Sequence, residues 1–193
     1  IIVSFLMESG VKMLLEELDN ALKRGARIRI LTGNYLGITQ PSALYLIKRK
    51  LGERVDLRFY NEKARSFHPK SYIFHYTEHS ELYIGSSNIS RSALTSGIEW
   101  NYRFTSTVDQ KNYAKFYRTF EDLFENHSVI IDDEELRRYS KNWHKPAVAK
   151  DIEKYDALDE GANDTNIRIL YEPRGAQIEA LCALEDTRAQ GAK

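Results

Sequence analysis

The stretch HPKSYIFHYTEHSELYIGSSN, residues 68–88, decides how this chain is interpreted. It holds two runs rich in aromatic and β-branched residues, 70–76 and 81–85, joined by the polar segment 77–80. Such runs predict two neighbouring strands that form a hairpin. The first strand begins at His-Pro-Lys and the second ends at Gly-Ser-Ser-Asn. If the strands pair, the polar side chains of both motifs converge at one edge of a sheet.

The residues before this stretch alternate between strand and helix patterns. Strands are predicted at residues 1–6, 27–32 and 55–60, and helices at 10–24 and 41–51, where apolar residues recur at helical spacing. An order of strand, helix, strand, helix, strand is typical of parallel strands in an α/β layer.

The residues after it continue the sheet and then turn helical. A third strand is predicted at 97–106, a long helix at 109–126 and a second, acidic helix near Asp132. The strand would carry three aromatic residues on one face: Trp100, Tyr102 and Phe104. The long helix carries an aromatic stripe that we interpret as core: Tyr113, Phe116, Tyr117, Phe120 and Phe124.

Composition divides the chain into three parts. Residues 1–142 are predicted to form one domain, and residues 143–166, which are polar and poorly periodic, a linker or surface excursion. A short strand at 167–170 and an amphipathic helix from Gly175 are expected in the last part, 167–193. The chain opens without Met, within a predicted strand, so a preceding segment is expected.

The overall numbers exclude several classes of protein. Lys and Arg total 28 and Asp and Glu total 28, so any nucleic-acid contact must come from a local basic patch. The single cysteine, Cys182, cannot form an internal disulfide, which favours a cytoplasmic location. No apolar run is long enough to span a bilayer, and no signal peptide is visible.

The two motifs become informative together. A lone His-x-Lys is more often a surface pair, and Gly-Ser-Ser-Asn alone is an ordinary turn. Side by side, they fit phosphodiester cleavage. The neutral imidazole of His68 can attack phosphorus, and Lys70, Ser86 and Asn88 can donate hydrogen bonds to the phosphate oxygens. A carboxylate is the usual partner that orients such an imidazole.

At this point the chain resembles the phospholipase D superfamily, whose motif is His-x-Lys, four residues, Asp, six residues, Gly-Ser-x-Asn. His75 stands where the motif has Asp. The pattern is closer to the metal-independent restriction endonucleases of this superfamily, in which a Glu eleven residues after the Asn serves near the His; here that residue is Glu99. The resemblance covers about residues 1–126 and implies an α/β fold, with a phospholipase D-like mixed sheet flanked by helices on both faces.

The resemblance also implies roles for five residues. His68 would be the nucleophile or the acid, Lys70 and Asn88 would bind phosphate, Glu99 would orient His68, and Ser86 completes the Gly-Ser-x-Asn match. The chemistry needs two His-x-Lys motifs, and this sequence holds one. The expected partner is therefore a second copy, in a homodimer that shares one active site. No metal or other cofactor is expected, since the other histidines show no metal-ligand spacing: His75, His79, His127 and His144.

Residues 171–181 resemble the segment that precedes the phosphate-binding loop in superfamily 2 DNA helicases. In that interpretation Gln177 contacts adenine, residues 167–193 begin a helicase domain, and ATP and magnesium serve only that domain. An ordinary amphipathic helix opened by Pro173 is the alternative. A helicase makes DNA the favoured substrate, with four candidate contacts that could equally be solvated charges: Lys63, Arg65, Arg91 and Arg103.

Two further hypotheses stay open. The chain could be a non-catalytic DNA-binding module of a helicase, or a lipid phosphodiesterase. Four intact site residues argue against the first, and the missing Asp and the absence of a membrane segment argue against the second. Cleavage specificity, strand preference and a role in restriction, repair or defence do not follow from the sequence.

Overall fold

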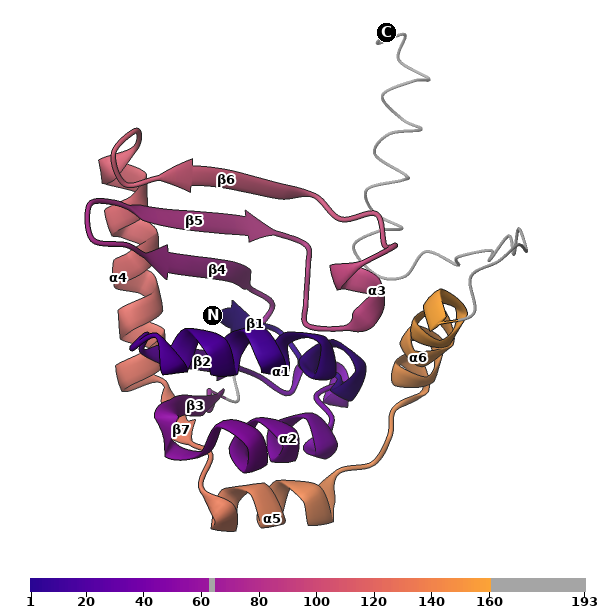
Figure 1. The fold of residues 1–193 in the computed structure, drawn as a ribbon. Helices are drawn as coiled ribbons and strands as arrows, with labels where there is room; N and C mark the ends of the chain where they lie inside the picture. Colours follow the sequence, from indigo (N-terminus) through magenta and orange to yellow (C-terminus); the bar gives the residue numbers. More distant parts are fainter. Residues whose placement is uncertain (63–64, 161–193) are drawn as a thin grey trace, which may run out of the picture. The chain divides into compact units, whose positions relative to one another are not determined.

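The structure is a computed structural model that describes residues 1–62 and 65–160 (Figure 1). The strands are β1 (Ile2–Val3), β2 (Ile28–Thr32), β3 (Val55–Tyr60), β4 (Lys70–His75), β5 (Ser80–Gly85), β6 (Asn101–Thr105) and β7 (Ser128–Ile130). The helices are α1 (Glu8–Lys23), α2 (Pro41–Leu51), α3 (Arg91–Leu94), α4 (Gln110–Asn126), α5 (Asp133–Asn142) and α6 (Ala147–Glu160). The chain divides into two compact units, Ile1–Gly161 and Ala162–Lys193, and the second lies outside the described residues.

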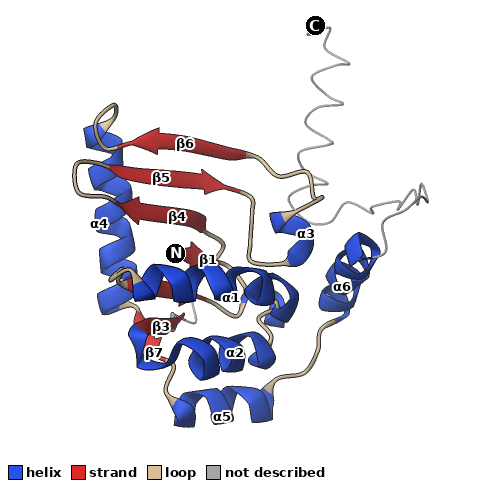
Figure 2. Cartoon of the chain, in the orientation of Figure 1, coloured by secondary structure: helices blue, strands red, loops and turns tan. Residues whose placement is uncertain are grey.

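The described strands form one mixed sheet in the order β6-β5-β4-β1-β2-β3-β7. The strands β1, β2 and β3 run parallel, connected through α1 and α2, as the alternating pattern predicted. The strands β4, β5 and β6 form an antiparallel meander that pairs with β1 through β4 (Figure 2). The predicted mixed α/β sheet is confirmed. The short strand β7, antiparallel to β3, was not predicted.

Helices cover both faces of the sheet, and β1 shows why. Successive strand residues point to opposite faces. Val3 is buried in a cluster with Val11 of α1 and Leu44 of α2. Its neighbour Ile2 is buried in a second cluster with Phe120 of α4. The apolar faces of these helices therefore pack on opposite sides of the same two-residue strand (Figure 1).

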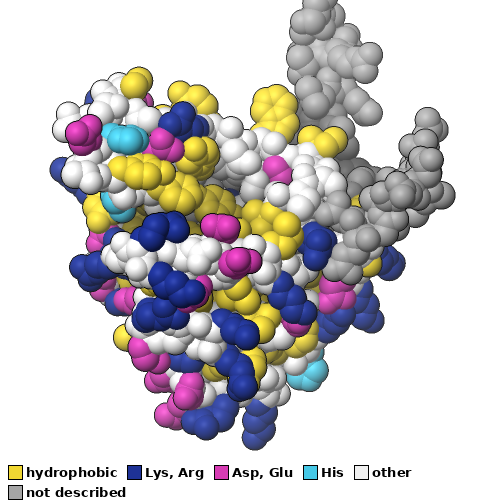
Figure 3. All heavy atoms as spheres, in the orientation of Figure 1, with side chains coloured by type: hydrophobic (Ala, Val, Ile, Leu, Met, Phe, Trp, Pro, Cys, Tyr) yellow, Lys and Arg dark blue, Asp and Glu magenta, His cyan; other side chains and the backbone are white. Residues whose placement is uncertain are grey.

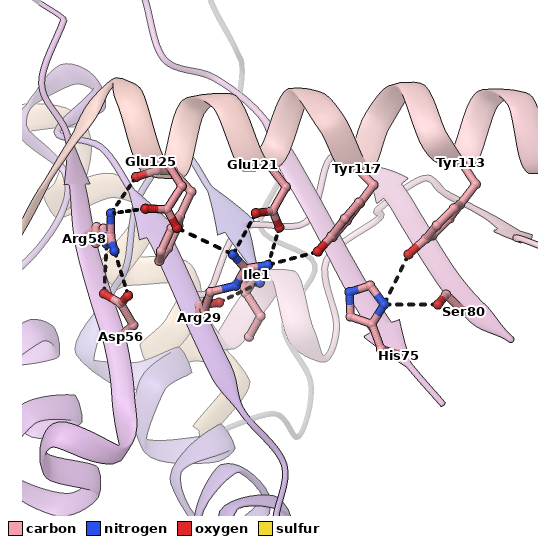
Figure 4. A network of polar contacts seen from close by, with 11 residues as sticks. Ile1, Arg29, Asp56, Arg58, His75, Ser80, Tyr113, Tyr117, Glu121 and Glu125 are labelled. Atoms are coloured by element: carbon pink, nitrogen blue, oxygen red, sulfur yellow. Dashed lines mark hydrogen bonds and ion pairs between the residues drawn. The ribbon is translucent and has the colours of Figure 1, made fainter. Parts of the chain in front are cut away.

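Helix α4 is fixed to the sheet by ion pairs over its aromatic core (Figure 4). Arg29 of β2 pairs with Glu121, and Arg58 of β3 pairs with Glu125 at 3.1 Å. Both guanidinium groups lie over the ring of Phe124, at 5.1 and 4.2 Å from its centroid. These contacts set the position of α4 along the strands, which packing of aromatic rings alone would leave less defined.

The two predicted aromatic faces are only partly buried. In α4, Phe120 and Phe124 are core, whereas Phe116 is 43% exposed. On β6, Phe104 is buried, with its ring centroid 5.8 Å from that of Phe116. Tyr102 on the same strand is exposed, as is Trp100, which lies just before β6 because the strand begins at Asn101 and not at the predicted residue 97. Aromatic periodicity therefore predicted the two faces, but not which of their residues are buried and which are exposed.

The segment after α4 is more ordered than its composition indicated. The acidic helix expected near Asp132 is α5, and the Asp132 side chain accepts a hydrogen bond from the Glu135 N–H at its start. Most of the predicted linker or surface excursion, 143–166, forms α6, in which Ala149 is buried. Asp156 is also buried, and its carboxylate accepts a hydrogen bond from Ser92 N–H at 2.8 Å. A buried carboxylate breaks the apolar periodicity by which such a helix is detected. The domain boundaries stay predictions. The elements expected after residue 166 lie outside the described residues.

Candidate active site

The His-Pro-Lys motif lies in the extended segment that leads into β4, beside the end of β1. The Ser4 hydroxyl donates to the Pro69 carbonyl at 3.1 Å and so ties the segment to β1. Lys70 is the first residue of β4 and is buried, whereas His68 remains accessible to solvent. The motif therefore presents an accessible imidazole next to a largely desolvated ammonium group.

The second motif begins where β5 ends, at Gly85. A Cβ atom at this position would lie 2.1 Å from the Trp100 carbonyl oxygen, so only glycine fits. This close approach lets the Ser86 N–H donate to the same carbonyl at 3.0 Å. The turn is thereby held against the residues that enter β6.

Asn88 joins this turn to β1. Its Oδ1 accepts hydrogen bonds from the backbone N–H groups of Ser4, at 3.0 Å, and Phe5, at 3.3 Å. These contacts also end β1 after Val3, although the sequence predicted a strand through residue 6. With Oδ1 occupied, Nδ2 is the group of Asn88 that can donate to a phosphate oxygen.

We expect the two roles of Asn88 to separate in a pair of variants. Asn88→Ala removes the acceptor of two buried N–H groups and should lower the free energy of unfolding by about 1–3 kcal/mol. Asn88→Asp keeps an acceptor oxygen and should stay closer to the original stability, while its negative charge repels phosphate and abolishes activity. Urea unfolding checks the first effect. Equal destabilisation by both variants would contradict the assignment of Oδ1.

The electrostatics of His68 and Lys70 are coupled. Lys70 Nζ lies 2.8 Å from both ring nitrogens of His68, a close contact between ammonium and imidazole rather than two separate hydrogen bonds. Burial lowers the pKa of Lys70 to about 8, against the opposing charge of Glu99. Partial burial and the Lys70 charge lower the pKa of His68. Both effects favour the neutral imidazole, the form that a nucleophile requires.

Glu99 reaches the same place from the segment before β6. It accepts a hydrogen bond from Ser86 Oγ, which itself accepts from the Trp100 N–H at 3.0 Å. Within residues 1–62 and 65–160, no hydrogen bond joins Glu99 to His68. The charge of Glu99 does raise the pKa of the nearby Tyr72 hydroxyl, after the larger effect of burial. The predicted role of Glu99 toward His68 stays a prediction.

Several residues of the site escaped the sequence analysis. The Tyr72 hydroxyl donates to the Ser87 carbonyl at 3.0 Å, and Asn101 Nδ2 donates to Ser87 Oγ at 2.8 Å. Tyr72 could have been found, since it lies two residues after Lys70 on the same face of a strand. Ser4 and Tyr35, which contact the His-Pro-Lys segment from distant elements, carry no local signal.

The residue that departs from the family motif lies away from these groups. His75 is the last residue of β4, whereas Lys70 is the first. Its Nδ1 lies 3.1 Å from the Ser80 hydroxyl and 3.2 Å from the Tyr113 hydroxyl (Figure 4). The replacement of Asp by His therefore lies outside the group of motif residues at the start of β4 and the end of β5.

The predicted DNA contacts are spread over the molecule. Arg65 is exposed, Arg91 begins α3 half-buried, and Arg103 on β6 is paired with Glu81. Lys63 lies outside the described residues, as does the predicted adenine contact Gln177. On the face shown in Figure 3, basic and acidic side chains are intermixed over the described helices, without a continuous basic surface.

Two searches of residues 1–62 and 65–160 gave negative findings. No described helix has the length and apolar character needed to cross a membrane. No cluster of three or more His, Cys, Asp or Glu side chains is placed to hold a metal ion.

A mixed sheet that brings a histidine, a buried lysine and the Gly-Ser-Ser-Asn turn to one edge defines a phosphodiesterase-type domain. The family model described as "Cardiolipin synthase, PLD-like domain" matches residues 1–128. The chain thus belongs to the phospholipase D-like family.

A solved structure, phosphatidylserine synthase from Haemophilus influenzae Rd KW20, is similar at 14% sequence identity and a TM-score of 0.47. The alignment covers 82% of this chain and 39% of that one, so the chain spans less than half of that protein. No curated protein matches the sequence.

Proposed function

We propose that this chain is a metal-independent DNA phosphodiesterase that acts through a phosphohistidine. The observation that carries the proposal is the contact between His68 and Lys70, in which the imidazole lies 2.8 Å from the buried ammonium group of Lys70. The imidazole nitrogen would bond to phosphorus as the bond to the leaving oxygen breaks. Lys70 and the Nδ2 of Asn88 would stabilise the charge that gathers on the non-bridging oxygens.

The remaining steps need a second imidazole. It would start protonated, give that proton to the leaving oxygen, and then, as the neutral imidazole, take a proton from the water that attacks the phosphohistidine. That attack breaks the P–N bond, releases the phosphate product and restores His68. Because the sequence holds one His-x-Lys motif, we infer that the second imidazole is His68 of another copy. Two identical motifs would then meet across a twofold axis.

The dimer gives a direct prediction. Sedimentation velocity should show a dimer at the concentrations at which the protein cleaves, and specific activity should fall on dilution below the dissociation constant. A protein that stays monomeric while its specific activity is constant on dilution would exclude a shared site.

DNA is proposed as the substrate on two resemblances. Glu99 follows Asn88 at the spacing of the restriction endonuclease branch, and residues 171–181 resemble the start of a superfamily 2 helicase. The helicase attachment, with ATP and magnesium serving only that part, and the cytoplasmic location belong to the same proposal. The presence of His75 in place of the motif's Asp supports DNA over lipid only weakly, since that residue lies at the far end of β4 from Lys70.

Phospholipid is the second candidate substrate, and the description of the matching family as cardiolipin synthase favours it. One assay compares the candidates: single-stranded DNA, duplex DNA and phosphatidylglycerol vesicles, each with EDTA. We expect DNA cleavage that EDTA does not reduce. Turnover of the vesicles alone would move the function to lipids. Salt-sensitive DNA binding without turnover would leave a non-catalytic module.

A further inference from the structure

The loop of residues 33–39, between β2 and α2, packs against the start of the His-Pro-Lys segment at two adjacent points. The ring of Tyr35 lies over the imidazole of His68, with centroids 4.4 Å apart and an interplanar angle of 50°. One step earlier, Gly33 approaches Phe67 so closely that a Cβ on Gly33 would lie 2.6 Å from the Phe67 ring. The loop therefore covers part of His68 that would otherwise face water.

This loop is closed and anchored from within. Leu36 and Gly37 both have positive φ, 52° and 72°, which turns the chain tightly. The Thr39 hydroxyl donates to the Gly33 carbonyl at 2.5 Å and accepts from the Leu6 N–H at 3.3 Å. The two ends of the loop are thus joined to each other and to the segment that follows β1.

The other side of the loop is held by the last described part of the chain. Trp143 Nε1 donates to the Gly37 carbonyl at 2.7 Å, and the Tyr139 hydroxyl lies 2.7 Å from the Thr39 carbonyl oxygen. Ile152 of α6 packs on the buried cluster that includes Ile38 and that Tyr35 also contacts. A continuous set of contacts therefore runs from α5 and α6, through the loop, to His68.

We propose that Tyr35 is a positioning residue for His68, and that α5, α6 and the segment between them fix the loop that carries it. A displacement of α6 would then change the orientation and hydration of the imidazole. That His68 is the nucleophile rests on the proposed function, whereas its contact with Tyr35 does not.

The first test reads His68 directly, by NMR titration of the histidine ring resonances, with His68→Gln to assign the signal. The groups that face His68 are Lys70 from β4 and Tyr35, with Glu99 acting on Lys70. Tyr35→Leu should rehydrate the imidazole and raise its pKa toward the ordinary value, since burial is the main cause of the lowering. Tyr35→Phe keeps the ring, so His68 should titrate in this variant as it does in the unmodified protein. Tyr45→Leu, at an exposed tyrosine of α2, is the matched control.

The second test measures whether α5 and α6 affect His68 through the loop of residues 33–39. Trp143→Phe removes the hydrogen bond to Gly37, and Ile152→Ala removes the contact from α6. Each should shift the His68 titration in the same direction as Tyr35→Leu, in protein that thermal unfolding shows to be folded. An unchanged titration in Tyr35→Leu would overturn the positioning role, and an unchanged titration in both of the others would overturn the coupling.

If the protein cleaves phosphodiesters, Tyr35→Leu should lower kcat by about tenfold to a hundredfold with KM little changed, as expected for a misplaced catalytic group. Tyr35→Phe should restore kcat, and an unchanged kcat in Tyr35→Leu would count against positioning. Absence of cleavage in all proteins would defeat the proposed function. The titrations would still show whether Tyr35 affects the pKa of His68.

Discussion

Replacement of His68 by alanine is expected to lower phosphodiester cleavage by a factor on the order of 10⁴ or more, as removal of a covalent nucleophile does in other enzymes. The loss should appear in the single-turnover rate constant, because the nucleophile takes part in the bond-forming step itself. In a shared site the same substitution removes both the nucleophile and the proton donor. The assay is single-turnover cleavage in the presence of EDTA.

A matched control is His79→Ala. His79 lies between β4 and β5, stacked on Tyr76 with a centroid distance of 4.8 Å, at the end of the hairpin opposite to the motif. Its replacement should leave the rate unchanged. Acid-labile, alkali-stable phosphoprotein in quenched reactions of the unmodified protein would identify the intermediate. Cleavage that survives His68→Ala, or that depends on added magnesium, would contradict the mechanism.

The elements whose local pattern agrees with their burial were predictable. Val55–Tyr60 alternates between buried and half-buried residues, and its strand was predicted at those bounds. α2 was predicted at its bounds because Pro41 opens it and its apolar residues recur at helical spacing. In both cases one face of the element is buried, so the spacing of its apolar residues matches its secondary structure.

The elements that were mispredicted depend on tertiary contacts. β1 is short because Asn88, more than eighty residues away, accepts the N–H groups that would continue its ladder. All of α6 was assigned to a linker or surface excursion because its sequence is polar and poorly periodic; one of its buried positions is Asp156, which bonds α3 instead of filling an apolar core. The spacing of apolar residues in one sequence cannot reveal a polar residue that is buried because other parts of the chain bond to it.

The candidate site divides in the same way. Residue types and the spacing of the phospholipase D motif predicted His68, Lys70 and Asn88 as site residues, and their roles stay predictions. Ser4 and Tyr35 follow β1 and β2, and they contact the motif only because β1 lies beside β4 and β2 is the next strand in the sheet order. Groups that orient a site from neighbouring strands become visible only when the strand order is known.

Lys70 carries the second large effect, and its pH dependence distinguishes its role. Lys70→Met should lower kcat by about 10²–10³-fold, the usual result when a donor to a developing anion is removed from a desolvated site. Lys12→Met, at an exposed lysine of α1, is the matched control and should be neutral. Equal losses in both variants would point to a general effect of charge rather than to phosphate binding.

The sign of the pH effect follows from the pKa of Lys70, about 8 in the folded protein. Below that pH the ammonium is charged and can donate to the phosphate; above it the charge is lost. The rate with EDTA should therefore fall as pH rises through about 8, with bound phosphate moving the midpoint upward because an anion favours the charged form. Lys70→Arg keeps its charge throughout this range, so its alkaline fall should disappear, at a lower maximal rate because the guanidinium is larger and planar. A rate that rises through pH 8 would contradict a charged donor role for Lys70 and would fit a general base, which gains activity when its proton is lost.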